Sequence, residues 1–221
     1  SQMDAYSEGY AGIGVWRAAL KQFVDRIADT DIRLQWFCCD RSTGVTDASG
    51  NRITLIRDTQ SPVALEYQAV KFIGTGRDNI KAGVFSGWEL GDYIYLRSEE
   101  AYMIKMEALA HKGSAEAVTE LNSFMKTRQP DYNYTFTNKA DLIEEIIYQK
   151  RVEFWGEGLE YIDNRRLNIP VDRTDETWGA ENNNHFSAGK FRYNQEDRPF
   201  LYQLPLSEIE NNSQLSPSDQ N

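Results

Sequence analysis

The sequence has little of the residues on which several common protein classes depend. Its 221 residues contain only two histidines and two cysteines. A zinc site built from several histidines is therefore excluded, and a His-dependent catalytic triad would have to use His111 or His185. The cysteines, Cys38 and Cys39, are adjacent, and neighbouring residues seldom reach the geometry of an ordinary disulfide. We expect no disulfide framework, no metal site and no cofactor.

Positive charge and long apolar runs are also scarce. The 24 Lys and Arg against 34 Asp and Glu give a net charge of −10, which would repel a phosphate backbone and argues against general nucleic-acid binding. No run of roughly 18 apolar residues exists, and the first residues lack a basic patch followed by an apolar run, so neither a membrane span nor a secretory signal is predicted. The chain is long enough for one large domain or two small ones.

The first part of the chain predicts one helix followed by irregular structure. Apolar residues recur at steps of three and four over residues 15–28, the pattern of an amphipathic helix. Residues 32–38 alternate with a period of two, which predicts a half-buried strand. Residues 53–56 and 69–73 are further short strand candidates. We interpret residues 30–92 as loops with a few short strands.

The second half predicts helical hairpins. A broad apolar stripe indicates a helix over residues 95–112, which Gly113 should end. Ser114 is placed to cap a second helix that runs to Met125, and so short a connection requires the two helices to lie antiparallel.

A second hairpin is expected further on. Asn138 precedes Asp141 by three residues, a signal for a helix start. That helix should run to the break at Gly156–Gly158, and its partner should follow over residues 159–167. Residues 170–200 are polar enough to predict a long surface loop, with one short apolar segment and a solvated tail after it.

Charged and aromatic residues supply the candidates for chemistry. Two carboxylates suffice for glycoside hydrolysis, and Glu153, Glu157 and Asp163 lie near the helix break. Arg151, Arg165 and Arg166 lie among them, so a structural ion-pair network is the alternative interpretation. His111 fits the last turn of a helix, and His185 fits a polar surface loop.

Exposed rings could bind a sugar by stacking. Trp36 and Trp88 lie in loop-rich stretches, outside the strong helical stripes. Asp40 and Arg41 are close enough in sequence to Trp36 to add polar contacts. These four residues are the candidate ligand-binding residues, and packing of both tryptophans into a core is the alternative.

Three segments of the second half, residues 95–108, 151–166 and 204–212, carry motifs whose order and spacing match one known family. They resemble the C-terminal half of the SusD/RagB family of outer-membrane nutrient-binding lipoproteins. In that family the matching charged residues are structural features of the helical hairpins. The matching positions are Arg97, Glu100, Glu107, Arg151, Glu153, Glu157, Asp163 and Arg166.

The resemblance implies a fold and an organisation. The fold would be mainly α, with tetratricopeptide-like helical hairpins and a loop-rich region containing a few short strands. Residues 1–92 would form the loop-rich segment with one amphipathic helix, and residues 93–221 the helical-hairpin region, together as one compact unit. Family members are longer, so the chain looks like a C-terminal piece, and the lipid-bearing N-terminal cysteine is absent from it.

The resemblance also implies a function. Such proteins bind glycan or other nutrients at the surface of the outer membrane, without catalysis, and pass them to a SusC-type TonB-dependent transporter. The ligand would be an oligosaccharide, and the protein partner would be the transporter. Two other hypotheses remain open: a glycoside hydrolase that uses a carboxylate pair, and a pure protein-interaction module of helical hairpins.

Overall fold

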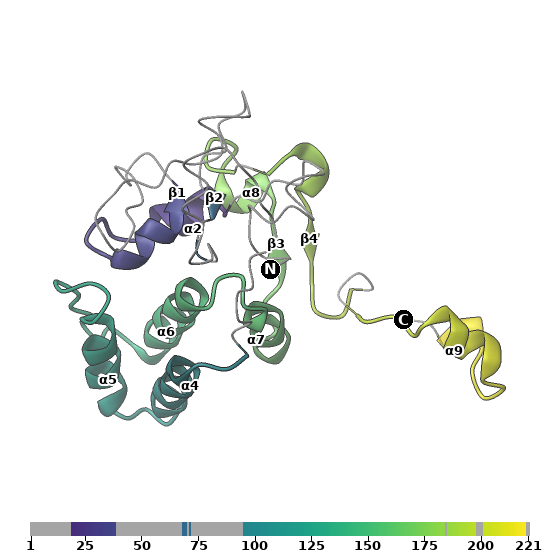
Figure 1. Ribbon diagram of the computed structural model, residues 1–221, viewed down its shortest axis with the longest axis horizontal. Coiled ribbons are helices and arrows are strands. Elements are labelled where there is room, and N and C mark those ends of the chain that lie inside the picture. The colour runs from purple at the N-terminus through teal and green to yellow at the C-terminus, as the bar shows by residue number, and fades with distance from the viewer. Residues whose placement is uncertain are drawn as a thin grey trace, which may run out of the picture. The chain divides into compact units, whose positions relative to one another are not determined.

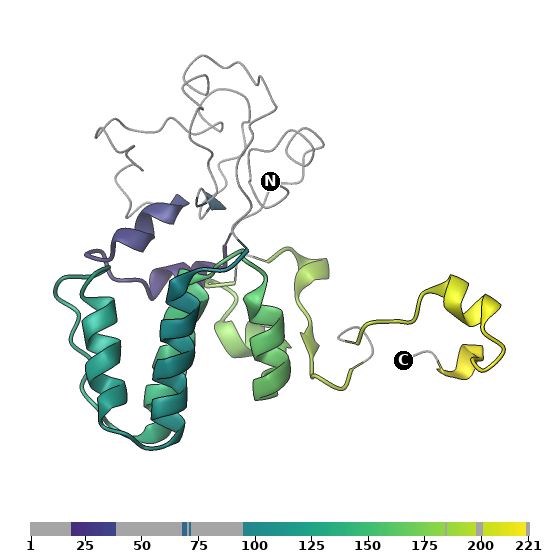
Figure 2. The same cartoon turned by 60° about the horizontal axis from the view of Figure 1, so that its bottom comes forward.

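The computed structural model describes residues 19–38, 68–69, 71, 95–183, 185–197 and 201–219 (Figures 1 and 2). The chain divides into two compact units, Ser1–Glu157 and Gly158–Asn221. The domain boundary expected at residue 92 and the strand expected at residues 53–56 fall outside the described residues and stay predictions.

The longest described helices of the first unit are α4 (Ser98–His111), α5 (Glu116–Met125) and α6 (Lys139–Glu153). α4 packs against both α5 and α6, and Figure 1 shows the three as neighbours. This confirms the mainly α fold and the first helical hairpin. Within this unit α6 packs on α4. The side chains buried on these helices include Met103, Met106, Ala110, Ala117, Leu121, Met125, Leu142 and Ile146.

The turn between α4 and α5 follows the predicted signals. Gly113 adopts a left-handed φ of 72°, a conformation that favours glycine. Its N–H donates to Ala110 O at 2.9 Å, and Ser114 N–H donates to Leu109 O at 3.0 Å. These two bonds form a Schellman motif, which satisfies carbonyls at the end of α4. The Ser114 hydroxyl then accepts from Glu116 N–H at 3.3 Å, although the N-cap of α5 is Ala115 and not the predicted Ser114.

Local signals also set both ends of α6. Asn138 is the N-cap, and its Oδ1 accepts from Asp141 N–H at 3.0 Å, as predicted. The helix ends before a break at which Gly156 and Gly158 have φ of 77° and 89°. β-Carbons make such angles costly, so the glycines permit the chain to leave the helix there.

The segment before the helices differs from the prediction. It contains α2 (Lys21–Asp25), the 3₁₀ helix η1 (Ile32–Trp36) and β1 (Phe37–Cys38), which pairs antiparallel with β2 (Gln68–Ala69).

The strand expected at residues 32–38 is therefore wrong over residues 32–36. Asp31 caps η1 by accepting from Arg33 N–H at 2.9 Å. The alternation placed Ile32 inside and Arg33 outside, but Ile32 is 55% exposed and Arg33 only 1%. A helix was expected at residues 15–28. The structure describes residues 19–28 of this range, and α2 spans Lys21–Asp25 within them.

This segment covers a second face of α6. Tyr148 and Val152 of α6 form one core cluster with residues of the N-terminal segment. Phe37 packs edge to face with Phe23 at 6.0 Å and with Trp155 at 5.5 Å between ring centroids. Because α6 packs against α4 and against this cluster, it is apolar over more than one stripe. The other members are Ala19, Val24, Ile27 and Leu34, and Trp36 packs against the cluster.

The second unit contains short elements: α7 (Leu159–Leu167), β3 (Val171–Asp172), α8 (Asp175–Trp178), η3 (Ser187–Gly189), β4 (Arg192–Tyr193), α9 (Leu206–Asn211) and η5 (Pro217–Asp219). β3 and β4 pair antiparallel. The described residues between 170 and 197 thus carry secondary structure where only loop was predicted, and α9 lies in the segment expected to be a solvated tail.

Polar side chains explain that local order. Asp172 accepts from the hydroxyls of Thr174 and Thr177, each at 2.7 Å, and from Arg192 at 2.9 Å. A polar segment can therefore order itself through its own hydrogen bonds. Among the residues that the structure describes, no helix is both long and apolar enough to cross a membrane.

Candidate functional site

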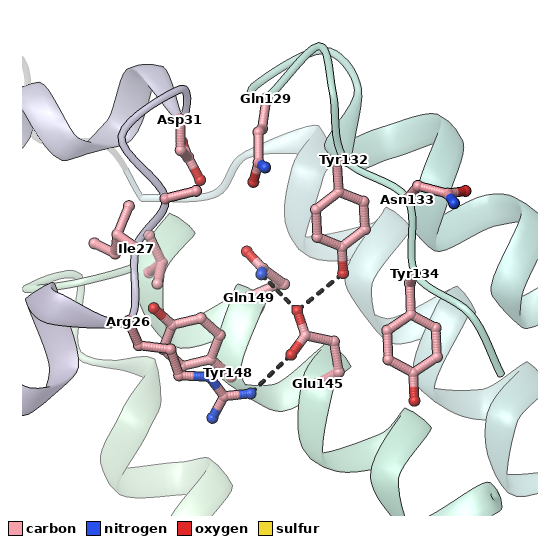
Figure 3. Close-up of a pocket in the computed structure, with 12 residues that line it drawn as sticks. Arg26, Ile27, Asp31, Gln129, Tyr132, Asn133, Tyr134, Glu145, Tyr148 and Gln149 are labelled. Atoms are coloured by element: carbon pink, nitrogen blue, oxygen red, sulfur yellow. Dashed lines mark hydrogen bonds and ion pairs between the residues drawn. The ribbon is translucent and has the colours of Figure 1, made fainter. Parts of the chain in front are cut away.

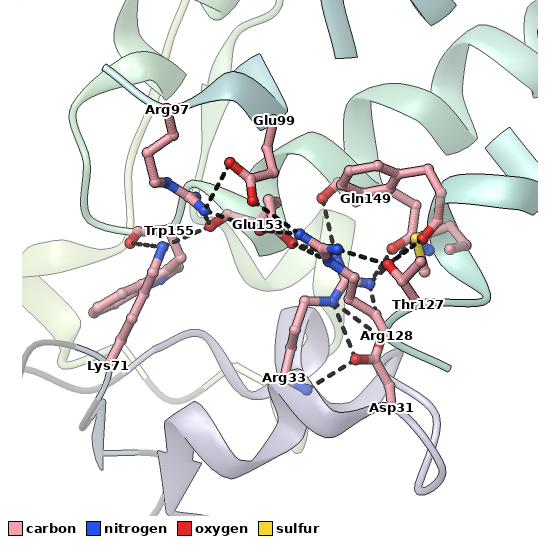
Figure 4. A network of polar contacts seen from close by, with 12 residues as sticks. Asp31, Arg33, Lys71, Arg97, Glu99, Thr127, Arg128, Gln149, Glu153 and Trp155 are labelled. Atoms are coloured by element: carbon pink, nitrogen blue, oxygen red, sulfur yellow. Dashed lines mark hydrogen bonds and ion pairs between the residues drawn. The ribbon is translucent and has the colours of Figure 1, made fainter. Parts of the chain in front are cut away.

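A buried carboxylate at the end of α6 is the centre of a charged cluster (Figure 4). Glu153 is 2% exposed and accepts hydrogen bonds from three arginines. Arg97 donates at 3.0 Å, Arg128 at 3.1 and 3.3 Å, and Arg33 at 3.4 Å. These donors come from the start of α4, the loop after α5, and η1, so the cluster joins three separate segments to α6.

Glu157 extends the cluster just beyond the helix. Arg97 donates to its two carboxylate oxygens at 3.0 and 2.9 Å, which makes a bidentate pair. Lys71 Nζ donates to Glu157 at 2.6 Å and to the backbone carbonyls of Glu153 and Trp155 at 2.6 and 3.1 Å. Lys71 thereby satisfies carbonyls at the end of α6, which a helix leaves without intrahelical partners.

We call this cluster the Glu153 network. Cations and carboxylates balance in it. Burial alone would raise the pKa of Glu153, but its hydrogen bonds and charge interactions with Arg128, Arg33 and Arg97 outweigh burial, and the pKa lies below its usual range. The carboxyl therefore stays ionised. The members are Asp31, Arg33, Lys71, Arg97, Glu99, Arg128, Glu153 and Glu157.

The predicted motif residues meet only in part. The structure joins Arg97, Glu153 and Glu157, which are three of the eight motif positions. Asp163 pairs with Arg166 at 2.8 Å in the second unit. Other motif residues hold ordinary helix positions: Glu100 is half-buried in the first turn of α4, Glu107 is buried one turn before His111, and Arg151 is half-buried near the end of α6.

Glu153 and Glu157 form the ion pairs that the alternative interpretation expected, but with different partners. Sequence reasoning proposed nearby arginines, whereas the structure supplies Arg33, Lys71, Arg97 and Arg128. Arg128 and Lys71 lie at no helical spacing from the carboxylates, so spacing alone gave no signal for them. The histidines fall as expected, His111 at the exposed end of α4 and His185 in a segment between short elements.

Of the four candidate ligand-binding residues, the structure describes one. Trp36 is half-buried and packs against the core cluster. Lys71 Nζ lies 4.7 Å from the centroid of its ring, in a cation–π contact. Trp88, Asp40 and Arg41 fall outside the described residues.

A pocket of about 340 Å³ opens elsewhere in the first unit (Figure 3). Its walls come from the segment after α2, the loop between α5 and α6, and one face of α6. Glu145 of α6 lies between Tyr148 and the two loop tyrosines, Tyr132 and Tyr134. We call this cavity the Glu145 pocket. Sequence reasoning missed this pocket, because its tyrosines lie partly on a loop and partly on a helix and so share no periodic pattern.

Hydrogen bonds fix the carboxylate of this pocket. Glu145 accepts from Tyr132 Oη at 2.9 Å, Gln149 Nε2 at 2.7 Å and Arg26 at 2.7 Å. The Arg26 guanidinium also lies 3.8 Å from the centroid of the Tyr148 ring. Burial raises the pKa of Tyr132, and the charge of Glu145 raises it further. Burial likewise raises the pKa of Tyr148, so both rings stay neutral in ordinary buffers.

The comparisons with known proteins agree with the fold. No curated protein matches the chain. A crystal structure described as a SusD-like carbohydrate binding protein from Bacteroides vulgatus ATCC 8482 matches with a TM-score of 0.58 and 21% identity. The match covers 91% of this chain and 41% of that one, so this chain spans less than half the length of its structural neighbour. The model of the SusD family matches residues 19–221. The chain therefore belongs to the SusD family.

Proposed function

We propose that this protein binds oligosaccharides without cleaving them and serves glycan uptake at the cell surface. The observation that carries the proposal is the SusD family match over residues 19–221. The structural neighbour from Bacteroides vulgatus is itself described as carbohydrate binding, which supports the same ligand class. The uptake partner in this proposal is a SusC-type TonB-dependent transporter of the outer membrane, beside which the protein would be held as a surface lipoprotein.

The state of the central carboxylates favours binding over hydrolysis. A glycosidase needs one carboxylic acid with a raised pKa and a second carboxylate facing the sugar. All four carboxylate oxygens of Glu153 and Glu157 accept from Arg or Lys side chains. The pKa of Glu153 is lowered, so this group is a poor proton donor. In our proposal Glu153 and Glu157 stabilise the fold and take no part in glycoside hydrolysis.

The proposed oligosaccharide contacts are Trp36, Trp88, Asp40 and Arg41. Sugar C–H faces pack on aromatic rings, while hydroxyls need polar partners such as a carboxylate or a guanidinium. The Lys71 contact gives Trp36 a second role in holding η1 against the core. We therefore expect Trp36→Ala to lower both the free energy of unfolding and ligand affinity, and Trp88→Ala to lower affinity alone.

The experiment is a binding screen of the purified chain against a panel of plant, bacterial and host oligosaccharides, by affinity electrophoresis. At least one glycan should retard the chain, and Trp88→Ala should abolish that retardation. Tyr202→Ala, an exposed aromatic in the second unit, is the matched control and should migrate like the parent. A chain that no glycan retards would contradict the proposal. Capture of the transporter from detergent-solubilised native membranes tests the partnership, and its absence from the captured material would refute that part.

A further inference from the structure

We draw no further inference here: the strongest candidate, the exposed apolar face of α4 that carries Ala101, Ile104 and Ala108, has the character of a docking surface for another helix, but nothing in the described part of the chain shows what covers it.

Discussion

Replacing Glu153 with glutamine should destabilise the first unit strongly, although the two side chains have nearly the same shape. The carboxylate is 2% exposed and pairs with three arginines at once. Removing one partner from a buried ion pair typically costs about 3–5 kcal/mol. Arg33 keeps Asp31 as a partner, and Arg97 and Arg128 are 19% and 20% exposed, so water can reach them. We therefore expect the lower end of that range, about 3 kcal/mol.

Urea unfolding followed by far-UV circular dichroism measures this loss. Glu120→Gln is the matched control, because Glu120 pairs with Lys105 at 2.7 Å on the exposed surface of the hairpin. An exposed pair of this kind contributes about 0–1 kcal/mol, so the control should unfold close to the parent. If Glu153→Gln also unfolds within about 1 kcal/mol of the parent, the Glu153 network does not hold these segments together.

The remaining predictions concern caps and carboxylates. Asn138→Ala should lower the free energy of unfolding by about 1 kcal/mol, because the Asp141 N–H loses its acceptor, and the same urea titration measures this. The pKa of Glu153 lies below its unfolded value, so its contribution to stability is present above about pH 4.3 and is lost as the pH falls through the folded pKa. Stability measured against pH should therefore fall less steeply on the acid side in Glu153→Gln. Burial alone would raise the pKa of Asp172, but hydrogen bonds from Thr177 and Thr174 and the charge of Arg192 lower it to about 2. Because Thr177→Val removes one of these hydrogen bonds, carboxyl NMR should show a higher pKa for Asp172 in that variant.

Helices with strong local signals could be predicted from the sequence. The end of α4 follows from Gly113 and the start of α6 from Asn138, because each cap needs only neighbouring residues. The error at residues 32–36 has a non-local cause. Arg33 turns inward because Glu153, 120 residues later, offers a buried carboxylate. A period-two pattern cannot show this, because it reports the hydrophobicity of a segment and not its distant partners.

The candidate sites also divide into a part that could be predicted from the sequence and a part that could not. Arg97, Glu153 and Glu157 were recognisable because a family motif contains them, and the structure joins them. Their further partners, such as Arg128, come from a loop with no periodic signal. The Glu145 pocket was missed since three distant segments form it and each looks ordinary alone. Which residues share a pocket depends on packing between segments, and a single sequence does not report that packing.

Glycan binding without cleavage is tested most directly by a calorimetric titration of the purified chain with the oligosaccharides of the panel, followed by chromatography of the recovered ligand. We expect saturable binding of at least one oligosaccharide, which returns from the mixture at its original length. Binding of no oligosaccharide, or recovery of shorter fragments that boiled protein does not produce, would contradict the proposal that this member of the SusD family is a non-catalytic glycan-binding protein.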